Sequence, residues 1–282
     1  MSGDGMPRPS VAREIMADPQ GAPEARATVL ILHGILASKR AWRSLAARVA
    51  ERRPELDVIA LDLRGHGDAR GRPGPHTLDT CARDLWAQQQ SDGPAGGAPS
   101  RDPAAIIGHS FGGKVALAAL RYWPSAEIWC LDSDPTPTSR SDSSEVERVL
   151  ATLDTLPAAP TRAEVTAAFA GFGAGFAAWM TTNLEPGGWR FEREVVRELL
   201  ASYRLADFTD GVRSQNVHLV RGERSDRWSP AGLALCEAIG ARAHVLANAG
   251  HWLHVDAADA LVELLTAQLV TDSCPARLRD QA

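Results

Sequence analysis

The segment Gly108-His109-Ser110-Phe111-Gly112-Gly113 follows an apolar run at 104–107 and precedes a helix-forming stretch at 114–121. This order predicts a buried strand that turns sharply into a helix. At such an elbow, glycines at 108 and 112 remove Cβ atoms that would otherwise clash with neighbouring backbone. Ser110 would stand at the end of the strand, near helix N–H groups that can receive an anion. We interpret Ser110 as a nucleophile rather than an incidental serine in a glycine-rich turn.

The composition is that of an ordinary globular chain with an acidic balance. The 282 residues are 44% hydrophobic, with a formal net charge of -5 and a pI near 5.9. The sequence shows no basic run for nucleic acid, no apolar stretch of membrane-spanning length and no charged-then-apolar signal pattern at its N-terminus. We therefore expect a soluble, cytoplasmic protein without a nucleic-acid partner, of undetermined oligomeric state. The cysteines show no CxxC spacing, so we expect no disulfide framework, metal site or cofactor.

Apolar strand-like runs alternate with helix-like segments on both sides of a long interruption. The runs predicted as strands are 28–32, 57–61, 104–107, 127–131, 217–220 and 243–246, with 11–16 as a possible edge strand. This alternation predicts an α/β fold, a mostly parallel sheet with helices on both faces. Between 136 and 211 it stops, and the helix-like segments are 144–153, 162–172 and 191–203. We predict a core formed by 1–135 and 212–282, with a helical cap inserted at 136–211.

Chemically useful side chains follow several of the predicted strands. Active-site groups collect at the carboxyl ends of parallel strands, which is where these residues fall: Ser110, Asp132, Asp226 and His251. Serine, acid and histidine in this order can form a catalytic triad in which His251 moves the proton of Ser110. The acid would be Asp132 or Asp226. Asp134 is a weaker candidate, because the proline after it favours an extended or turn role.

Two backbone positions could stabilise a developing oxyanion beside Ser110. The first predicted buried strand ends in His33-Gly34-Ile35-Leu36, whose loop could offer the N–H of Ile35 or Leu36. The N–H of Phe111, directly after the nucleophile, would be the second donor. Other polar residues of the nearby loops are interpreted as structural: His33, Asp62, Arg64 and His66.

Aromatic residues gather in the predicted cap. They and one methionine could line an apolar acyl pocket or form the cap's own core: Phe169, Phe172, Phe176, Trp179 and Met180. We take Phe176 and Trp179 as candidate substrate-binding residues. Trp252, beside His251, is a third candidate.

Taken together, these motifs resemble the α/β-hydrolase superfamily over nearly the whole chain. The motifs are the His-Gly loop, the Asp-Leu-Arg-Gly-His-Gly loop at 62–67, the elbow, the cap and Ala249-Gly250-His251-Trp252. More narrowly, the lysine that ends 108–114, the stretch 179–184 and Gly250-His251-Trp252 resemble a small-esterase branch. That branch includes bacterial acyl-ester and acyl-CoA thioesterases and mitochondrial relatives. The resemblance implies the α/β-hydrolase fold with an inserted helical cap.

The resemblance also bears on the choice of acid. In most of the superfamily the acid follows the penultimate strand, but here the equivalent spacing from Gly222 reaches Ser225, one place before Asp226. The small-esterase branch is similar in having a serine there and the acid after the preceding strand. The resemblance thus implies Asp132 as the acid and Ser225 as an auxiliary hydrogen-bonding residue beside His251.

The activity implied is that of a serine hydrolase. It would cleave carboxylic esters or thioesters of small to medium acyl chains through an acyl-enzyme, with a small-molecule substrate and no cofactor. A perhydrolase or a carbon–carbon bond hydrolase would use the same triad. A ligand-binding module on the same fold is an alternative of another class, disfavoured because binding requires no complete triad.

Overall fold

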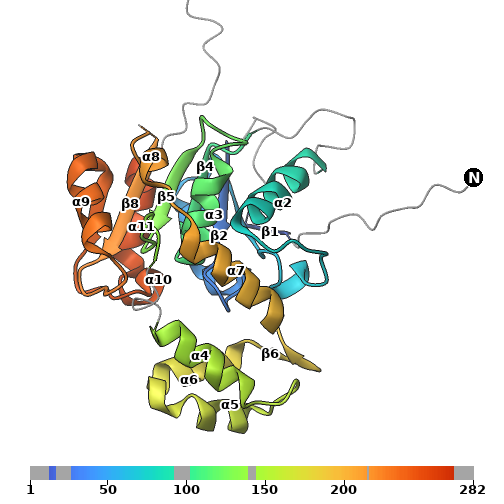
Figure 1. Cartoon of the computed structure of the whole chain (residues 1–282). Helices are drawn as coiled ribbons and strands as arrows, with labels where there is room; N and C mark the ends of the chain where they lie inside the picture. The colour runs from blue at the N-terminus through green and yellow to red at the C-terminus, as the bar shows by residue number, and fades with distance from the viewer. Residues whose placement is uncertain (1–12, 17–26, 92–101, 139–143, 215, 270–282) are drawn as a thin grey trace, which may run out of the picture.

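A seven-stranded sheet forms the centre of the computed structural model, which describes residues 13–16, 27–91, 102–138, 144–214 and 216–269 (Figure 1). The strand order is β1-β3-β2-β4-β5-β8-β9. The strands are β1 (Arg13–Met16), β2 (Ala27–Leu32), β3 (Leu56–Leu61), β4 (Ala105–His109), β5 (Glu127–Leu131), β8 (Val217–Gly222) and β9 (Ala243–Leu246). All neighbours pair in parallel except β1, which is antiparallel to β3. The predicted mostly parallel sheet is confirmed.

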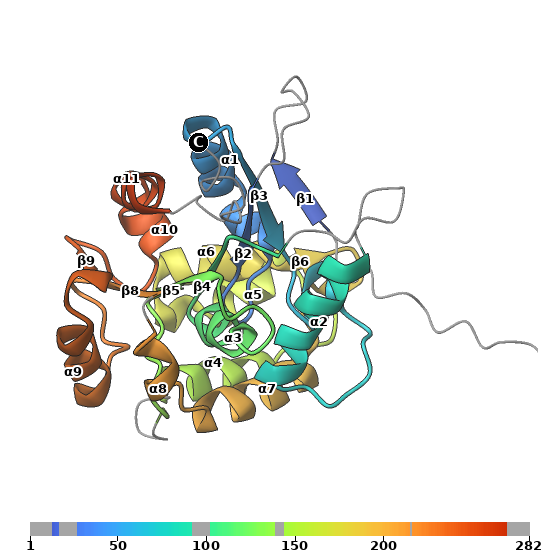
Figure 2. The ribbon, with the colours of Figure 1, turned by 90° about the horizontal axis from the view of Figure 1, so that it is seen from above.

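Helices cover both faces of this sheet, so the central strands are buried on both sides (Figure 2). One face packs against α1 (Arg43–Arg52), α10 (Leu253–Asp256) and α11 (Ala258–Gln268). The other packs against α2 (Leu78–Ser91), α3 (Phe111–Ala119), α8 (Thr209–Val212) and α9 (Pro230–Ile239). Burial on both faces explains why β4 and β5 are continuous apolar runs rather than alternating ones. Short 3₁₀ helices are η1 (Lys39–Trp42), η2 (Gly67–Ala69), η3 (Ala170–Phe172) and η4 (Gly240–Arg242).

The chain between β5 and β8 forms a separate helical layer, which we call the cap segment (residues 144–205). It contains α4 (Ser144–Asp154), α5 (Arg162–Ala168), α6 (Ala174–Thr182), a hairpin of β6 (Leu184–Glu185) and β7 (Gly188–Trp189), and α7 (Arg193–Leu205). In Figure 1, α4, α5, α6 and the hairpin lie below the core, and α7 runs along the core's lower edge. Residues of the cap segment, such as Val165, Phe169 and Met180, form most of a hydrophobic cluster that also includes Leu36 of the core.

Three details of the cap segment differ from the sequence prediction. The helix predicted over 162–172 ends at Ala168, and η3 and Gly173 follow it. Gly173 has a φ of 97°, a value that glycine adopts without steric cost and that ends the helical run. The prediction for this region contains neither α6 nor the hairpin, and the last predicted helix begins two residues later than expected, at Arg193.

Candidate active site

Ser110 occupies a strained elbow between β4 and α3. Its φ of 53° and ψ of -117° lie outside the regions that residues with a Cβ prefer. A Cβ atom at Gly108 would lie 2.1 Å from the carbonyl oxygen of Gly112, and one at Gly112 would lie 2.6 Å from that of His33. Glycine is therefore required on both sides of the serine. A hydrogen bond stabilises this backbone conformation: the N–H of Ser110 donates to the carbonyl of Leu131 at 2.9 Å.

Asp132 follows β5 and accepts four hydrogen bonds while being 1% exposed. Its Oδ2 accepts from Nδ1 of His251 at 2.7 Å and from Oγ of Ser225 at 2.6 Å. Its Oδ1 accepts from the N–H of Gly222 at 3.1 Å and from Nε1 of Trp228 at 2.9 Å. The carboxyl group of Asp132 is therefore the acceptor in all four contacts, two on each oxygen.

The two other acid candidates have different surroundings. The side chain of Asp226 is 89% exposed and pairs with Nε of Arg227 at 3.4 Å. Asp134 accepts from the N–H and the hydroxyl of Thr136 at 2.8 and 2.7 Å, and from the N–H of Ser229 at 2.7 Å. Asp134 thus stabilises the turn after β5. Of the three acids, Asp132 is the one hydrogen-bonded to His251 in the described structure.

Two further histidine rings, those of His109 and His254, lie close to the His251 loop. Nε2 of His109 donates to the carbonyl of His251 at 2.8 Å, and the two rings lie 4.8 Å apart. Burial lowers the pKa of His109 well below its usual value. Burial also lowers the pKa of His254 to about 4, and this ring stacks on Trp42 at 4.4 Å. Near neutral pH these two histidines are uncharged, so neither acts as a cation beside His251.

His109 and Trp228 do not appear among the predicted site residues. His109 is visible in the elbow motif, but its contact with the carbonyl of His251 joins positions 142 residues apart. The bond from Trp228 to Asp132 spans 96 residues, and no local spacing in the sequence indicates it.

The two loops expected to form an oxyanion hole meet beside Ser110. A Cβ atom at Gly34 would lie 3.4 Å from Cβ of Ser110, so this loop directly approaches the nucleophile. The N–H of Leu36 is donated to Nε2 of His66 at 3.1 Å. The expectation that Leu36 could supply an oxyanion donor is corrected here, because its N–H already has a partner. Ile35 and Phe111, the first residue of α3, are the positions that stay as candidates.

The loop residues interpreted as structural make structural contacts. His33 donates from Nδ1 to the carbonyl of Gly34 at 2.7 Å and accepts from the N–H of Leu63 at 2.9 Å. His66 donates to the carbonyl of Arg64 at 2.9 Å, and burial lowers its pKa to about 3. Arg64 forms a two-point ion pair with Asp84, and Asp62 accepts from the N–H groups of Lys39 and Asp68. These side chains tie the loops after β2 and β3 together.

A cavity of about 320 Å³ brings the predicted site residues together. All of them except Ser225 line it: Ser110, Asp132, Asp226, His251, Ile35, Leu36, Phe111, Phe176, Trp179 and Trp252. Trp179 meets Trp252 edge to face at 4.5 Å, and Phe176 lies 6.4 Å from Trp252. Phe169 and Met180 are instead fully buried in the cap cluster. The lining also includes the charged residues Glu145, Arg204 and Arg227.

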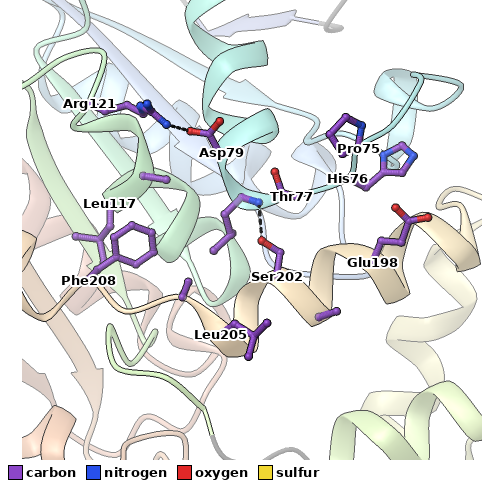
Figure 3. Close-up of a pocket in the computed structure, with 14 residues that line it drawn as sticks. Pro75, His76, Thr77, Asp79, Leu117, Arg121, Glu198, Ser202, Leu205 and Phe208 are labelled. Atoms are coloured by element: carbon purple, nitrogen blue, oxygen red, sulfur yellow. Dashed lines mark hydrogen bonds and ion pairs between the residues drawn. The ribbon is translucent and has the colours of Figure 1, made fainter.

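A second, larger groove of about 990 Å³ lies between α2, α3 and α7 (Figure 3). Its lining is mostly apolar, including Leu117, Leu205 and Phe208. At its rim, Arg121 pairs with Asp79, and the hydroxyl of Ser202 accepts from the N–H of Leu78 at 3.1 Å. It shares no lining residue with the first cavity. We therefore place the candidate active site in the smaller cavity.

This combination of a parallel sheet, a serine on a strand-to-helix elbow and an aspartate–histidine pair is typical of hydrolytic enzymes. The chain belongs to the alpha/beta hydrolase family, whose family model matches residues 29–264. The protein is accordingly a hydrolase, with esterase-like relatives.

Two curated relatives and one solved structure illustrate the similarity. Lipase LipV of Mycobacterium tuberculosis is 37% identical over 50% of this chain and 51% of its own length. The match therefore spans only about half of that relative. Esterase YbfF of Escherichia coli is 25% identical over 84% of this chain and 91% of its own length. The structure described as a marine microorganism esterase aligns with a TM-score of 0.72 and 19% identity, over 92% of this chain and 99% of that one.

Two further features are absent from the described residues. No helix among them is long and apolar enough to cross a membrane. Within the same ranges, no cluster of three or more His, Cys, Asp or Glu side chains could hold a metal ion.

Proposed function

We propose that this hydrolase cleaves carboxylic esters and thioesters of small to medium acyl chains, with Ser110 as nucleophile, His251 as base and Asp132 as the orienting acid. The observation that carries the proposal is the 2.7 Å bond between Nδ1 of His251 and the buried Asp132, in the cavity that Ser110 also lines. A serine on a strained elbow, a histidine and a carboxylate at the same strand ends are the parts that acyl transfer requires.

The hydrogen bond to Asp132 determines which nitrogen of His251 can act as a base. With Nδ1–H donated to the carboxylate, Nε2 is left unprotonated and can accept the hydroxyl proton of Ser110. The serine oxygen then attacks the carbonyl carbon, and the imidazolium returns its proton to the leaving alcohol or thiol. Water repeats the sequence on the acyl-enzyme, which releases the acid and restores Ser110.

The negative oxygen of each tetrahedral intermediate would face backbone donors. We assign these to the N–H groups of Ile35 and Phe111, since the N–H of Leu36 is donated to His66. Each such donor is typically worth about a hundred- to a thousandfold in kcat. Ser225, whose hydroxyl shares Oδ2 of Asp132 with His251, helps to hold the carboxylate in place.

The aromatic wall of the cavity suggests where the acyl chain would lie. Phe176 and Trp179 come from the cap segment and meet Trp252, the neighbour of His251 in the chain. These side chains offer an apolar surface next to the nucleophile. A chain of small to medium length matches a cavity of about 320 Å³.

The test is kcat/KM on p-nitrophenyl esters from acetyl to decanoyl and on acyl thioesters, for the wild-type protein and Ser110→Ala. We expect turnover that is lost in Ser110→Ala and unchanged in Ser214→Ala, a control at an exposed serine. Equal turnover in Ser110→Ala and wild type would refute the proposed nucleophile. If the protein turns over only perhydrolase substrates or substrates with a cleavable carbon–carbon bond, the proposed ester hydrolysis is wrong. Binding of ligands without any turnover would also refute it.

A further inference from the structure

Lys114 is one of only two lysines in the chain and is fully buried. The sequence contains 30 lysines and arginines together, of which Lys39 and Lys114 are the lysines. Lys114 lies in α3, four positions after Ser110, and is 0% exposed. A buried ammonium requires partners for all of its N–H groups. Because the remaining basic positions are all arginine, the residue type at 114 calls for an explanation from its contacts.

The ammonium of Lys114 donates three hydrogen bonds, all to backbone carbonyls. The acceptors are Thr136 at 2.7 Å, Tyr203 at 3.0 Å and Ala206 at 3.0 Å. An ammonium carries three donors in a tetrahedral arrangement, whereas a guanidinium is planar and larger. The three carbonyls therefore match lysine in both number and shape.

The acceptors belong to the two connections between the core and the cap segment. Thr136 lies where the chain leaves β5 toward α4, and Tyr203 and Ala206 lie at the C-terminal end of α7, where the chain returns. The last carbonyls of a helix lack partners within the helix, and a cation there is favoured. One side chain thus joins the entry and the exit of the cap segment to the helix that begins at the nucleophile.

The surroundings of Lys114 keep the ammonium charged near neutral pH. Burial lowers its pKa to about 8, and the carboxylate of Asp134 opposes this shift more than Cys130 or Asp207 does. Its Nζ also lies 4.5 Å from the ring centre of Tyr203. Below a pH of about 8 all three N–H donors are present.

Tyr203 connects this contact to the candidate active site. It lines the active-site cavity, and its ring lies 6.0 Å from that of Phe111, the residue after the nucleophile. The apolar wall formed by Phe176 and Trp179 belongs to the cap segment, whereas Ser110, Asp132 and His251 belong to the core. A shift of the cap segment relative to the core would therefore move this apolar wall and leave Ser110, Asp132 and His251 in place.

We propose that Lys114 is a positioning residue that fixes both connections of the cap segment on α3 and thereby sets the affinity for longer acyl chains. The inference rests on the proposed ester hydrolysis. A general loss of stability would affect all substrates alike. The proposal instead predicts a change in KM for long acyl chains and an unchanged kcat for short ones.

The kinetic test compares Lys114→Met with Lys39→Met, which makes the same chemical change at the other lysine. Lys39 pairs with Asp68, whose side chain is 60% exposed. Loss of the three contacts in Lys114→Met should raise KM for the decanoyl ester at least about tenfold and leave kcat for the acetyl ester within about twofold. Lys39→Met should change neither. Equal changes for the two esters in Lys114→Met, or no change, would overturn the proposal.

A second measurement needs no variant at Lys114 and no turnover. In protein labelled with ¹³C at lysine Cε, NMR resolves two lysine side chains, and Lys39→Met identifies them. We expect Lys114 to titrate below the usual range of a lysine side chain and to retain slowly exchanging ammonium protons. An ordinary lysine titration with fast exchange at Lys114 would overturn the proposal even if Lys114→Met does not fold. If instead Ser110→Ala keeps full turnover while Lys114 shows the expected NMR behaviour, the proposed reaction fails and the anchoring contact stands.

Discussion

Replacement of Asp132 by asparagine tests the arrangement around the acid most directly. The carboxylate accepts from four donors, two on each oxygen. If the amide group of the substituted side chain turns toward His251, the imidazole must carry its proton on Nε2, where it cannot accept the proton of Ser110. If the amide turns the other way, it faces the N–H groups of Gly222 and Trp228, which are also donors.

Both orientations are therefore unfavourable, for different reasons. The wrong tautomer of a catalytic histidine lowers kcat by about 10⁴, equal to about 5.4 kcal/mol of transition-state stabilisation. In the alternative orientation the amide N–H groups face the donors of Gly222 and Trp228. Each donor that loses its acceptor in this way costs about 1–3 kcal/mol of stability. We expect kcat to fall by at least about a thousandfold.

The assay is kcat/KM on p-nitrophenyl butyrate, with circular dichroism to show that each variant is folded. Asp226→Asn is the matched control, because the side chain of Asp226 is 89% exposed and pairs only with its neighbour Arg227 in the described structure. Asp226→Asn should keep most of the wild-type kcat/KM, because His251 is hydrogen-bonded to Asp132 and not to Asp226 in the described structure. Our reasoning about the acid is wrong if Asp132→Asn keeps more than one-tenth of the wild-type kcat/KM. It is also wrong if Asp226→Asn loses most of its activity.

Three further predictions concern the elbow, the support of the acid and the response to pH. Gly108→Ala places a Cβ atom 2.1 Å from a carbonyl oxygen and should destabilise the fold by at least about 3 kcal/mol in urea unfolding. Gly175→Ala, which meets nothing within 4 Å, should cost nothing. Trp228→Phe removes one donor to Asp132 and should lower kcat about tenfold, whereas Trp86→Phe, at a tryptophan that does not line the active-site cavity, should leave kcat unchanged. If both tryptophan variants behave alike, Trp228 does not support the acid. Unfolding free energy should fall as pH drops below about 6.5, because the unfolded chain gains protons that the folded chain excludes. The fall should reach up to about 1.4 kcal/mol per pH unit for each deeply buried histidine whose pKa is lowered by burial. These histidines are His33, His66, His109 and His254. A flat profile between pH 7 and 5 would contradict the neutral, buried state of these rings.

The fold was predictable from the sequence because its signals are local. The glycine at 108 is demanded by a clash with the backbone of Gly112, four residues along the chain. The buried strands are short apolar runs separated by helix-length segments, and this alternation by itself implies a parallel sheet with helices on both faces. The same reasoning placed Ser110 and His251 at one edge of the sheet, since all parallel strands end there.

The cap segment was less predictable, because its helices are defined by packing more than by local signals. α6 is apolar on most sides and begins directly after Gly173, and β6 and β7 are two residues each. Segments this short have little intrinsic preference, so their structure depends on contacts within the cap cluster.

The sequence by itself determined the elbow, the sheet and the set of polar residues at its edge, because short-range sterics and hydrophobic periodicity govern these. Only the tertiary structure decided which partners meet: Asp132 with His251 across 119 positions, and Leu36 with His66 across 30. It also placed the ammonium of Lys114 on carbonyls 22 to 92 positions away. Such contacts depend on the exact paths of turns after the strands, where a shift of one residue reverses the direction of a side chain, and no pattern within one segment specifies them.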